Sequence, residues 1–255
     1  MPLDRQPCLP QGAVTALSLL AELSRTPAAD FRDNAVVEFS EQFSLDVSSM
    51  DASQRKAFFD ATGERAFEVA QQIYVHDMAP RIRSVLKAVI DLDLPAPSNT
   101  VPAGGFWGAI EAFMVAVGRL DNLDPGLTEV VRLRGARLHD CAVCKSRRSI
   151  DALETGSTEA EFTAIDYWPR SDLPARTKAA LGLVDAMVFT PHDLPQSVIN
   201  EARRQLSETE IVEVLLDVVR NAANKIAVAL GADAATVTEG VELFTTDSDG
   251  NVLVI

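Results

Sequence analysis

The sequence predicts an all-α fold, and three observations support this prediction. Hydrophobic residues recur at helical spacing through most of the 255-residue chain. Clusters of proline and glycine separate these periodic segments. The chain also has no alternation of strand and helix patterns, no glycine-rich phosphate loop and no low-complexity tract.

The N-terminal hundred residues are predicted to be helical for most of their length. Residues 1–12 are polar and contain prolines, so we expect them to be irregular. Pro80 suits the first position of a helix, because a proline there loses no helical hydrogen bond, and Ser53 is expected to cap another. Periodicity predicts helices over residues 13–25, 53–76 and 80–92, and a partly helical segment over residues 30–50.

The strongest break in the chain lies at residues 94–105, where three prolines and two glycines occur within twelve positions. We therefore expect two regions. Residues 1–100 form an N-terminal helical region whose role the sequence leaves open. Residues 101–255 form a helical domain that carries a cysteine pair.

The second half of the chain is predicted to contain a series of helices and one hairpin. Ser207 and Glu210 form a capping-box pattern that opens a long helix to about Leu230, which Gly231 ends. The tail has β-prone runs on either side of an Asp-Gly turn, which predicts a short C-terminal hairpin. Further helices are predicted over residues 106–120, 125–138, 174–189 and 195–206.

The composition limits the partners and the compartment. The formal net charge is −14, so nucleic acid and an anionic membrane surface would both be repelled. No apolar run approaches the ~20 residues of a membrane-spanning helix, and the N-terminus does not resemble a signal peptide. Three cysteines do not form a disulfide framework of the secreted type. We therefore expect a cytoplasmic protein with no nucleic-acid and no membrane partner.

Two of the three cysteines, Cys141 and Cys144, form a Cys-x-x-Cys pair directly after Asp140. If Asp140 caps a helix, Cys141 occupies its first position and Cys144 lies one turn further along. Two thiols in a first turn can close a disulfide, and the positive end of the helix favours a thiolate. Ile150 and Leu153 continue an apolar stripe beyond the pair, so the same helix is expected to extend through them.

The residues alone leave three uses of this pair open: a redox couple, half of a zinc site, or two small buried side chains. A structural zinc site needs about four ligands, and the rest of the chain contains only Cys8 and the histidines at positions 76, 139 and 192. Buried cysteines commonly act as small apolar residues. The pattern favours the redox use, with no cofactor and no bound metal.

The stretch before the pair adds a carboxylate at a defined spacing. Glu129 lies twelve residues before Cys141, in the run Glu129-Val-Val-Arg-x-Arg-Gly-Ala-Arg-x-x-Asp-Cys-x-x-Cys. This run resembles the signature of the alkylhydroperoxidase D and carboxymuconolactone decarboxylase family. In that signature, a Glu and an Arg-containing helix precede a Cys-x-x-Cys pair that is followed by a His. The resemblance covers roughly residues 101–232, including the segments that begin at Ala175 and Leu206.

The resemblance implies an alkylhydroperoxidase D-like helical bundle that forms homo-oligomers and acts as a thiol peroxidase or disulfide reductase. Cys144 would attack a small-molecule hydroperoxide, and Cys141 would resolve the resulting sulfenic acid as a disulfide. Glu129 would take part in the proton relay. A dithiol reductant protein, lipoylated or thioredoxin-like, would then restore the pair.

Arg148 departs from the family pattern, because it stands where the family has its histidine, four residues after Cys144. A guanidinium cannot release its proton near neutral pH, but at i+4 on one helix face it can stabilise a thiolate. Activity with His139 or water as the proton carrier is one outcome. The other is a fold reused without peroxidase activity, as a non-catalytic redox-sensing oligomer. A carboxymuconolactone decarboxylase-like lyase is a third reading, although that branch does not generally depend on a cysteine pair.

Overall fold

The computed structural model describes residues 8–25, 32–95 and 105–255, and it is mostly helical, with one small three-stranded sheet. The prediction of a helical fold is confirmed at this level. Among the described residues, no helix is both long and apolar enough to cross a membrane. The α-helices are α1 (Gln11–Leu23), α2 (Asn34–Asp46), α3 (Ala52–Thr62), α4 (Ala66–Ile90), α5 (Gly105–Gly118), α6 (Pro125–Leu138), α7 (Ala142–Lys145), α8 (Ile150–Glu154), α9 (Glu159–Ala164), α10 (Ala175–Phe189), α11 (Gln196–Gln205), α12 (Glu208–Ala222) and α13 (Lys225–Leu230). The 3-10 helices are η1 (Val47–Ser49), η2 (Gly63–Arg65) and η3 (Ile165–Arg170), and the strands are β1 (Arg147–Ser149), β2 (Glu242–Thr246) and β3 (Val252–Val254).

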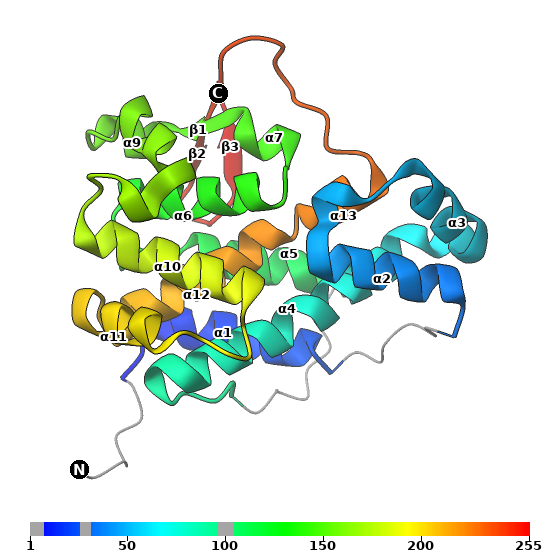
Figure 1. The fold of residues 1–255 in the computed structure, drawn as a ribbon, viewed down its shortest axis with the longest axis horizontal. Helices are drawn as coiled ribbons and strands as arrows, with labels where there is room; N and C mark the ends of the chain where they lie inside the picture. The colour runs from blue at the N-terminus through cyan, green and yellow to red at the C-terminus, as the bar shows by residue number, and fades with distance from the viewer. Residues whose placement is uncertain (1–7, 26–31, 96–104) are drawn as a thin grey trace.

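Helices α6, α10 and α12 pack against one another in the left half of the molecule as drawn in Figure 1. Helix α4 contacts both α10 and α12. Helix α5 packs against α12 and α1. The small sheet lies beside α6 (Figure 1). Strand β1 follows α7 directly, whereas the chain reaches β2 and β3 through a long loop after α13. Helix α6, which leads directly into the cysteine pair, is therefore held by several neighbours.

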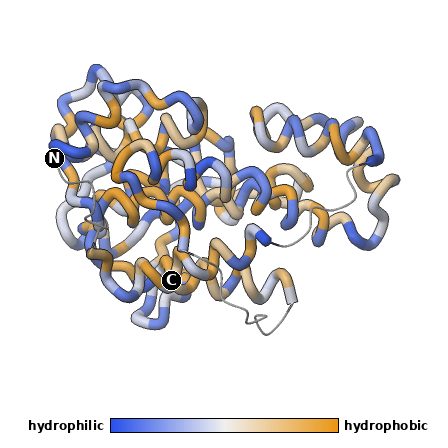
Figure 2. Tube along the Cα trace, turned by 90° about the horizontal axis from the view of Figure 1, so that it is seen from below, coloured by the Kyte–Doolittle hydropathy of each residue, from blue (hydrophilic) through white to orange (hydrophobic). Residues whose placement is uncertain are grey.

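One hydrophobic core joins the N-terminal hundred residues to the rest of the chain. Hydrophobic and hydrophilic residues alternate along the helices in Figure 2, as expected for helices with one buried face. Most of the expected boundary between two regions, residues 96–104, lies outside the described residues. The shared core includes Leu17 of α1, Phe39 of α2, Ile82 of α4, Phe113 of α5 and Leu215 of α12.

The predicted helices over residues 53–92 are divided at the wrong place. Asp51, not Ser53, caps α3, and α4 runs as one helix through Pro80. The expected helix start at Pro80 is therefore wrong. A proline inside a helix costs about 3 kcal/mol or more, and here the burial of neighbouring side chains such as Ile82 offsets this cost.

The C-terminal elements follow the predictions more closely. Ser207 caps α12 through a capping box with Glu210, as predicted. The expected continuous helix to Leu230 is interrupted at Asn224, and α13 forms a separate helix that ends at the left-handed Gly231. The predicted hairpin is confirmed, because β2 and β3 pair antiparallel. Strand β1, which was not predicted, pairs parallel to β2.

Candidate functional site

Cys141 and Cys144 lie in the short connection between α6 and β1, where they form a disulfide with Cα atoms 5.3 Å apart. The predicted cap is wrong, because Asp140 adopts a left-handed conformation with φ 51°, whereas an N-cap residue has extended backbone. Cys141 is the cap instead. Its sulfur accepts a hydrogen bond from the backbone N–H of Cys144 at 3.3 Å.

Helix α7 is also shorter than predicted. It has four residues, and the chain then enters β1. Ile150 and Leu153 belong to the separate helix α8, which Ser149 caps. The expected single helix through the cysteine pair is therefore wrong. The helix ends early because β1 pairs with β2, a strand that comes much later in the chain.

Cys144 lines a cavity of about 730 Å³, here called the cysteine cavity, whereas Cys141 does not. The exposed fractions are 9% for Cys144 and 1% for Cys141. A volume of this size is typical of small-molecule sites. Of the two cysteines, Cys144 is therefore the one that a small molecule in the cavity can contact. The apolar part of the lining includes Ala112, Met114, Val115, Val143, Phe244 and Val252.

Glu129 is buried beside this connection and binds Arg132. Its two carboxylate oxygens accept hydrogen bonds from Nε and Nη2 of Arg132 at 2.6 and 2.7 Å, and one also accepts from the backbone N–H of Ser149 at 3.2 Å. Arg132 in turn donates to the carbonyl oxygens of Cys144 and Arg147, at 2.9 and 2.8 Å. Glu129 thus reaches the cysteine connection through Arg132, and its part in a proton relay stays a prediction.

Arg148 lies on β1 and does not line the cysteine cavity. Its Nε and Nη2 donate to the carboxylate of Glu159 at 2.9 and 3.1 Å, and its guanidinium lies 5.6 Å from the ring centre of Phe162. The expected i+4 position on one helix face with Cys144 is wrong, because α7 ends at Lys145. The positive charge at this cavity comes from other arginines.

Three arginines that line the cysteine cavity, Arg132, Arg147 and Arg220, were not predicted as site residues. Arg132 stands three residues after Glu129 on α6, and this spacing by itself predicts an ion pair on a helix. Arg147 pairs with Glu242 at 2.6 Å across β1 and β2. Arg220 comes from α12. No local pattern in the sequence connects Arg147 or Arg220 with the cysteines.

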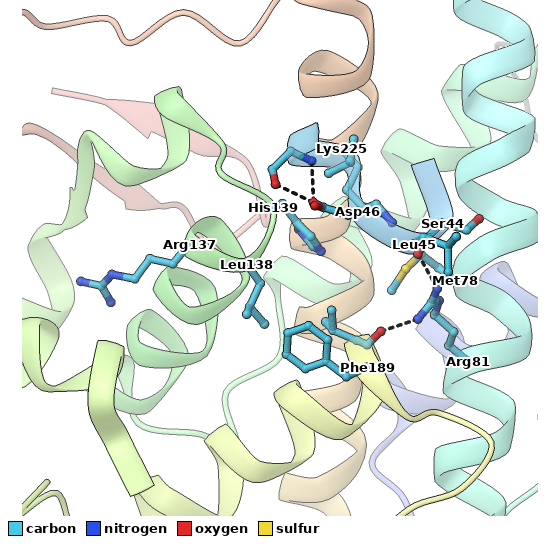
Figure 3. Close-up of a pocket in the computed structure, with 13 residues that line it drawn as sticks. Ser44, Leu45, Asp46, Met78, Arg81, Arg137, Leu138, His139, Phe189 and Lys225 are labelled. Carbon is cyan, nitrogen blue, oxygen red and sulfur yellow. Dashed lines mark hydrogen bonds between the residues drawn. The ribbon is translucent and has the colours of Figure 1, made fainter. Parts of the chain in front are cut away.

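His139 follows the last residue of α6 and lines a different cavity of about 360 Å³, here called the histidine cavity. Figure 3 shows its imidazole in this cavity with Asp46, Lys225 and Phe189. Burial, with smaller effects of Lys225 and Arg81, lowers the pKa of His139 to about 3. The ring is therefore neutral near pH 7. Its role as a proton carrier for the cysteines stays a prediction that this position does not favour.

A zinc site would need several ligands close together. Within residues 8–25, 32–95 and 105–255, no group of three or more His, Cys, Asp or Glu side chains is arranged to hold a metal ion. Cys8 is a free thiol and is exposed.

Two known proteins are similar to this chain over nearly its whole length. It is 38% identical to the uncharacterized protein Rv2313c of Mycobacterium tuberculosis strain ATCC 25618 / H37Rv, and equally to the uncharacterized protein MT2376 of strain CDC 1551 / Oshkosh. Each alignment covers 98% of this chain and 90% of the relative. The chain belongs to the family of these two proteins.

A more distant relative matches part of the chain. The uncharacterized protein YdfG of Bacillus subtilis strain 168 is 27% identical over 111 residues, which is 42% of this chain and 76% of the relative. No family model matches the chain, and no solved structure matches it.

Proposed function

We propose that this protein is a thiol-dependent peroxidase of the alkylhydroperoxidase D type, which reduces hydroperoxides through the Cys141–Cys144 couple. One observation carries the proposal: Cys144 lines a cavity large enough for a small molecule, while its disulfide partner Cys141 is buried and does not line it. The charges agree with this division, because arginines beside a thiol favour the thiolate that attacks.

The proposed reaction has two steps at Cys144. First, the Cys144 thiolate attacks the outer oxygen of the hydroperoxide ROOH. The O–O bond breaks, the alkoxide leaves and takes up a proton to become ROH, and Cys144 becomes a sulfenic acid. The Cys141 thiolate then attacks the Cys144 sulfur, the S–S bond forms, and the departing hydroxide is protonated to water. The two thiols lose two electrons, and the hydroperoxide gains them.

Backbone contacts support the two roles. The N–H of Cys144 donates to the Cys141 sulfur at 3.3 Å, and a hydrogen bond of this kind stabilises the thiolate that resolves the sulfenic acid. Arg132 holds the carbonyl oxygen of Cys144 at 2.9 Å, and Glu129 holds Arg132. Glu129 is therefore assigned as a positioning residue that acts through Arg132.

A dithiol reductant completes the cycle. A lipoylated or thioredoxin-like protein returns the disulfide to two thiols by thiol–disulfide exchange, which oxidises the reductant to its own disulfide. We place this cycle in the cytoplasm, where such reductants keep thiols reduced, and in a homo-oligomer of the chain.

A steady-state assay and a trapping experiment test the proposal. With dihydrolipoamide as the dithiol, Cys144→Ser should abolish hydroperoxide-dependent turnover. Cys141→Ser should accumulate a sulfenic acid on Cys144, which dimedone traps and mass spectrometry locates. Cys8→Ser is the matched control and should retain full turnover, because Cys8 is exposed and outside the pair. Full turnover by Cys144→Ser would overturn the proposal.

A redox sensor without turnover is the second candidate. One observation favours it: β1 follows the cysteine pair closely and pairs with the C-terminal strand β2, so a change at the disulfide can reach the hairpin. The same assay decides between the two. A disulfide that forms and breaks once with peroxide and dithiol, but sustains no repeated turnover, favours the sensor.

A further inference from the structure

The cysteine cavity contains a positive charge that forms no ion pair with any described residue. Arg132 and Arg147 each form an ion pair with a glutamate. For the guanidinium of Arg220, by contrast, no hydrogen bond or ion pair occurs among the described residues, although it lines the same cavity as Cys144. Burial lowers the pKa of Arg220, so its charge is held in an environment that favours a partner.

The acidic groups near Arg220 do not neutralise it. Asp217, one turn earlier on α12, attracts Arg220, but the two form no ion pair in the described part of the chain. Burial raises the pKa of Asp217 to about 7, so this carboxyl is only partly ionised near neutral pH. Glu111, also at the cavity, is exposed and accepts a hydrogen bond from the indole of Trp107 at 2.6 Å. The guanidinium of Arg220 is therefore available to an anion that enters the cavity.

The remaining lining residues indicate what else this anion carries. Asn221 brings an amide group that can donate hydrogen bonds to an oxyanion. The amide nitrogens of Asn224 and Asn251 already donate to the carbonyl of Asn221 and to the carboxylate of Asp247. Phe244 and Val143 belong to the apolar lining, which suits a hydrocarbon chain. Because Arg132 and Arg147 are already paired with glutamates, Arg220 leaves one positive charge, which matches a single negative charge such as that of a carboxylate.

We propose that the ligand of the cysteine cavity is an amphiphilic carboxylate, a fatty-acid hydroperoxide whose carboxylate binds Arg220 while its peroxide group reaches Cys144. This inference rests on the proposed function, because it names the substrate class of that same site. Arginine binds a carboxylate through two parallel hydrogen bonds, which gives both affinity and orientation. Local arginines are also needed to attract an anion to a chain whose formal net charge is −14.

Two substrates that differ only in charge test the inference. A medium-chain ω-hydroperoxy fatty acid and its methyl ester are assayed with the wild type, Arg220→Gln and Arg220→Lys. The wild type should have the lower KM for the acid. Arg220→Gln should raise the KM for the acid, relative to the KM for the ester, by about 10- to 100-fold, the range of a charge-assisted hydrogen bond. Arg220→Lys should restore part of the preference.

Arg119→Gln provides the matched control. Arg119 is exposed and does not line the cavity. Its Nε donates at 2.8 Å to the backbone carbonyl of Asp249, in the turn between β2 and β3. Its loss should leave both KM values unchanged, and thermal unfolding checks that each variant is folded. Equal KM values for acid and ester in the wild type, or an Arg220→Gln variant that keeps the preference, would overturn the inference and leave the peroxidase proposal intact.

A binding measurement separates the two proposals. The saturated carboxylate of the same chain length is titrated by calorimetry into Cys144→Ser, with and without Arg220→Gln. Affinity that falls at least tenfold with Arg220→Gln supports the carboxylate site even if neither hydroperoxide is reduced, a result that would count against the proposed function alone. No detectable binding of the carboxylate, or equal binding by both variants, would overturn the inference.

Discussion

The cysteine cavity and the histidine cavity are lined by consecutive residues, Asn224 and Lys225, yet their charges are arranged in opposite ways. At the histidine cavity, Asp77 binds both Nζ of Lys225 and Nε of Arg81, each at 2.7 Å. At the cysteine cavity, the guanidinium of Arg220 has no comparable partner among the described residues. Asp77 therefore pairs two cations at the first cavity, whereas no described carboxylate forms an ion pair with Arg220 at the second.

This difference distinguishes cations that hold the helices together, such as Arg81 and Lys225, from Arg220, which we propose binds a ligand. Arg81 also donates to the backbone carbonyls of Val188 and Ser44, so it joins three elements. One nitrogen of Arg137 is buried without a partner, but its charge is paired with Asp166 at 2.9 Å. A buried network of this kind fixes the packing of helices. An unpaired cation in the same cavity as Cys144 instead supports the proposal that this cavity binds a ligand.

The largest effect is expected where the complete network is broken. Asp77→Ala should lower the free energy of unfolding by about 3–5 kcal/mol, because it leaves the buried ammonium of Lys225 without its carboxylate. Turnover per folded molecule should stay the same. Asp166→Ala, which removes a partly exposed ion pair, is the control and should cost about 1 kcal/mol or less. Urea unfolding measures both, and equal costs would contradict a structural role for Asp77.

A slightly smaller effect, and one that depends on pH, is expected beside the cysteine cavity. Burial raises the pKa of Asp217 from 3.8 to about 7. The unfolded chain loses this proton first as the pH rises, so the protein loses stability between about pH 4 and pH 7. At 1.36 kcal/mol per pKa unit, this loss is about 4 kcal/mol. Asp217→Asn should remove it, so the stability of the variant relative to wild type should rise from pH 4 to pH 8 in urea unfolding. A difference that does not change with pH would contradict this assignment.

The third effect distinguishes positioning from proton transfer at Glu129. Glu129→Gln keeps the shape of the side chain but removes the charge that Arg132 pairs with. We expect a loss of about 2 kcal/mol in stability and about tenfold in turnover, because Arg132 also holds the carbonyl of Cys144. A pH profile of kcat that keeps its shape supports positioning through Arg132. A profile that loses one of its limbs would instead make Glu129 a proton carrier.

Local signals in the sequence were sufficient for much of the helical fold. The Ser207 capping box, the left-handed Gly231 and the Asp-Gly hairpin depend on residues a few positions apart, and all three are present. The helix through Pro80 could not be predicted in this way, because burial by distant elements stabilises it.

The candidate site divides along the same line. The proximity of Cys141 and Cys144 follows from their spacing alone. The short length of α7 depends on the pairing of β1 with the distant β2, so Arg148 was placed on the wrong element. Arg220 enters the cysteine cavity from α12, and only the packing of the whole chain brings it there. Contacts between distant segments therefore determine which charged side chains line the cavity with Cys144.

The smallest effect on activity is expected at the histidine cavity. His139→Gln should change turnover at pH 7.5 by less than about twofold, because His139 is neutral there and does not line the cysteine cavity. Its effect on stability should appear only in acid. Since the pKa of His139 is about 3 in the folded state and 6.5 unfolded, the unfolded chain takes up a proton first as the pH falls below 6.5. The variant should therefore gain about 2 kcal/mol relative to wild type between pH 7.5 and pH 5. A tenfold loss of turnover would instead link the two cavities and restore His139 as the proton carrier for Cys144.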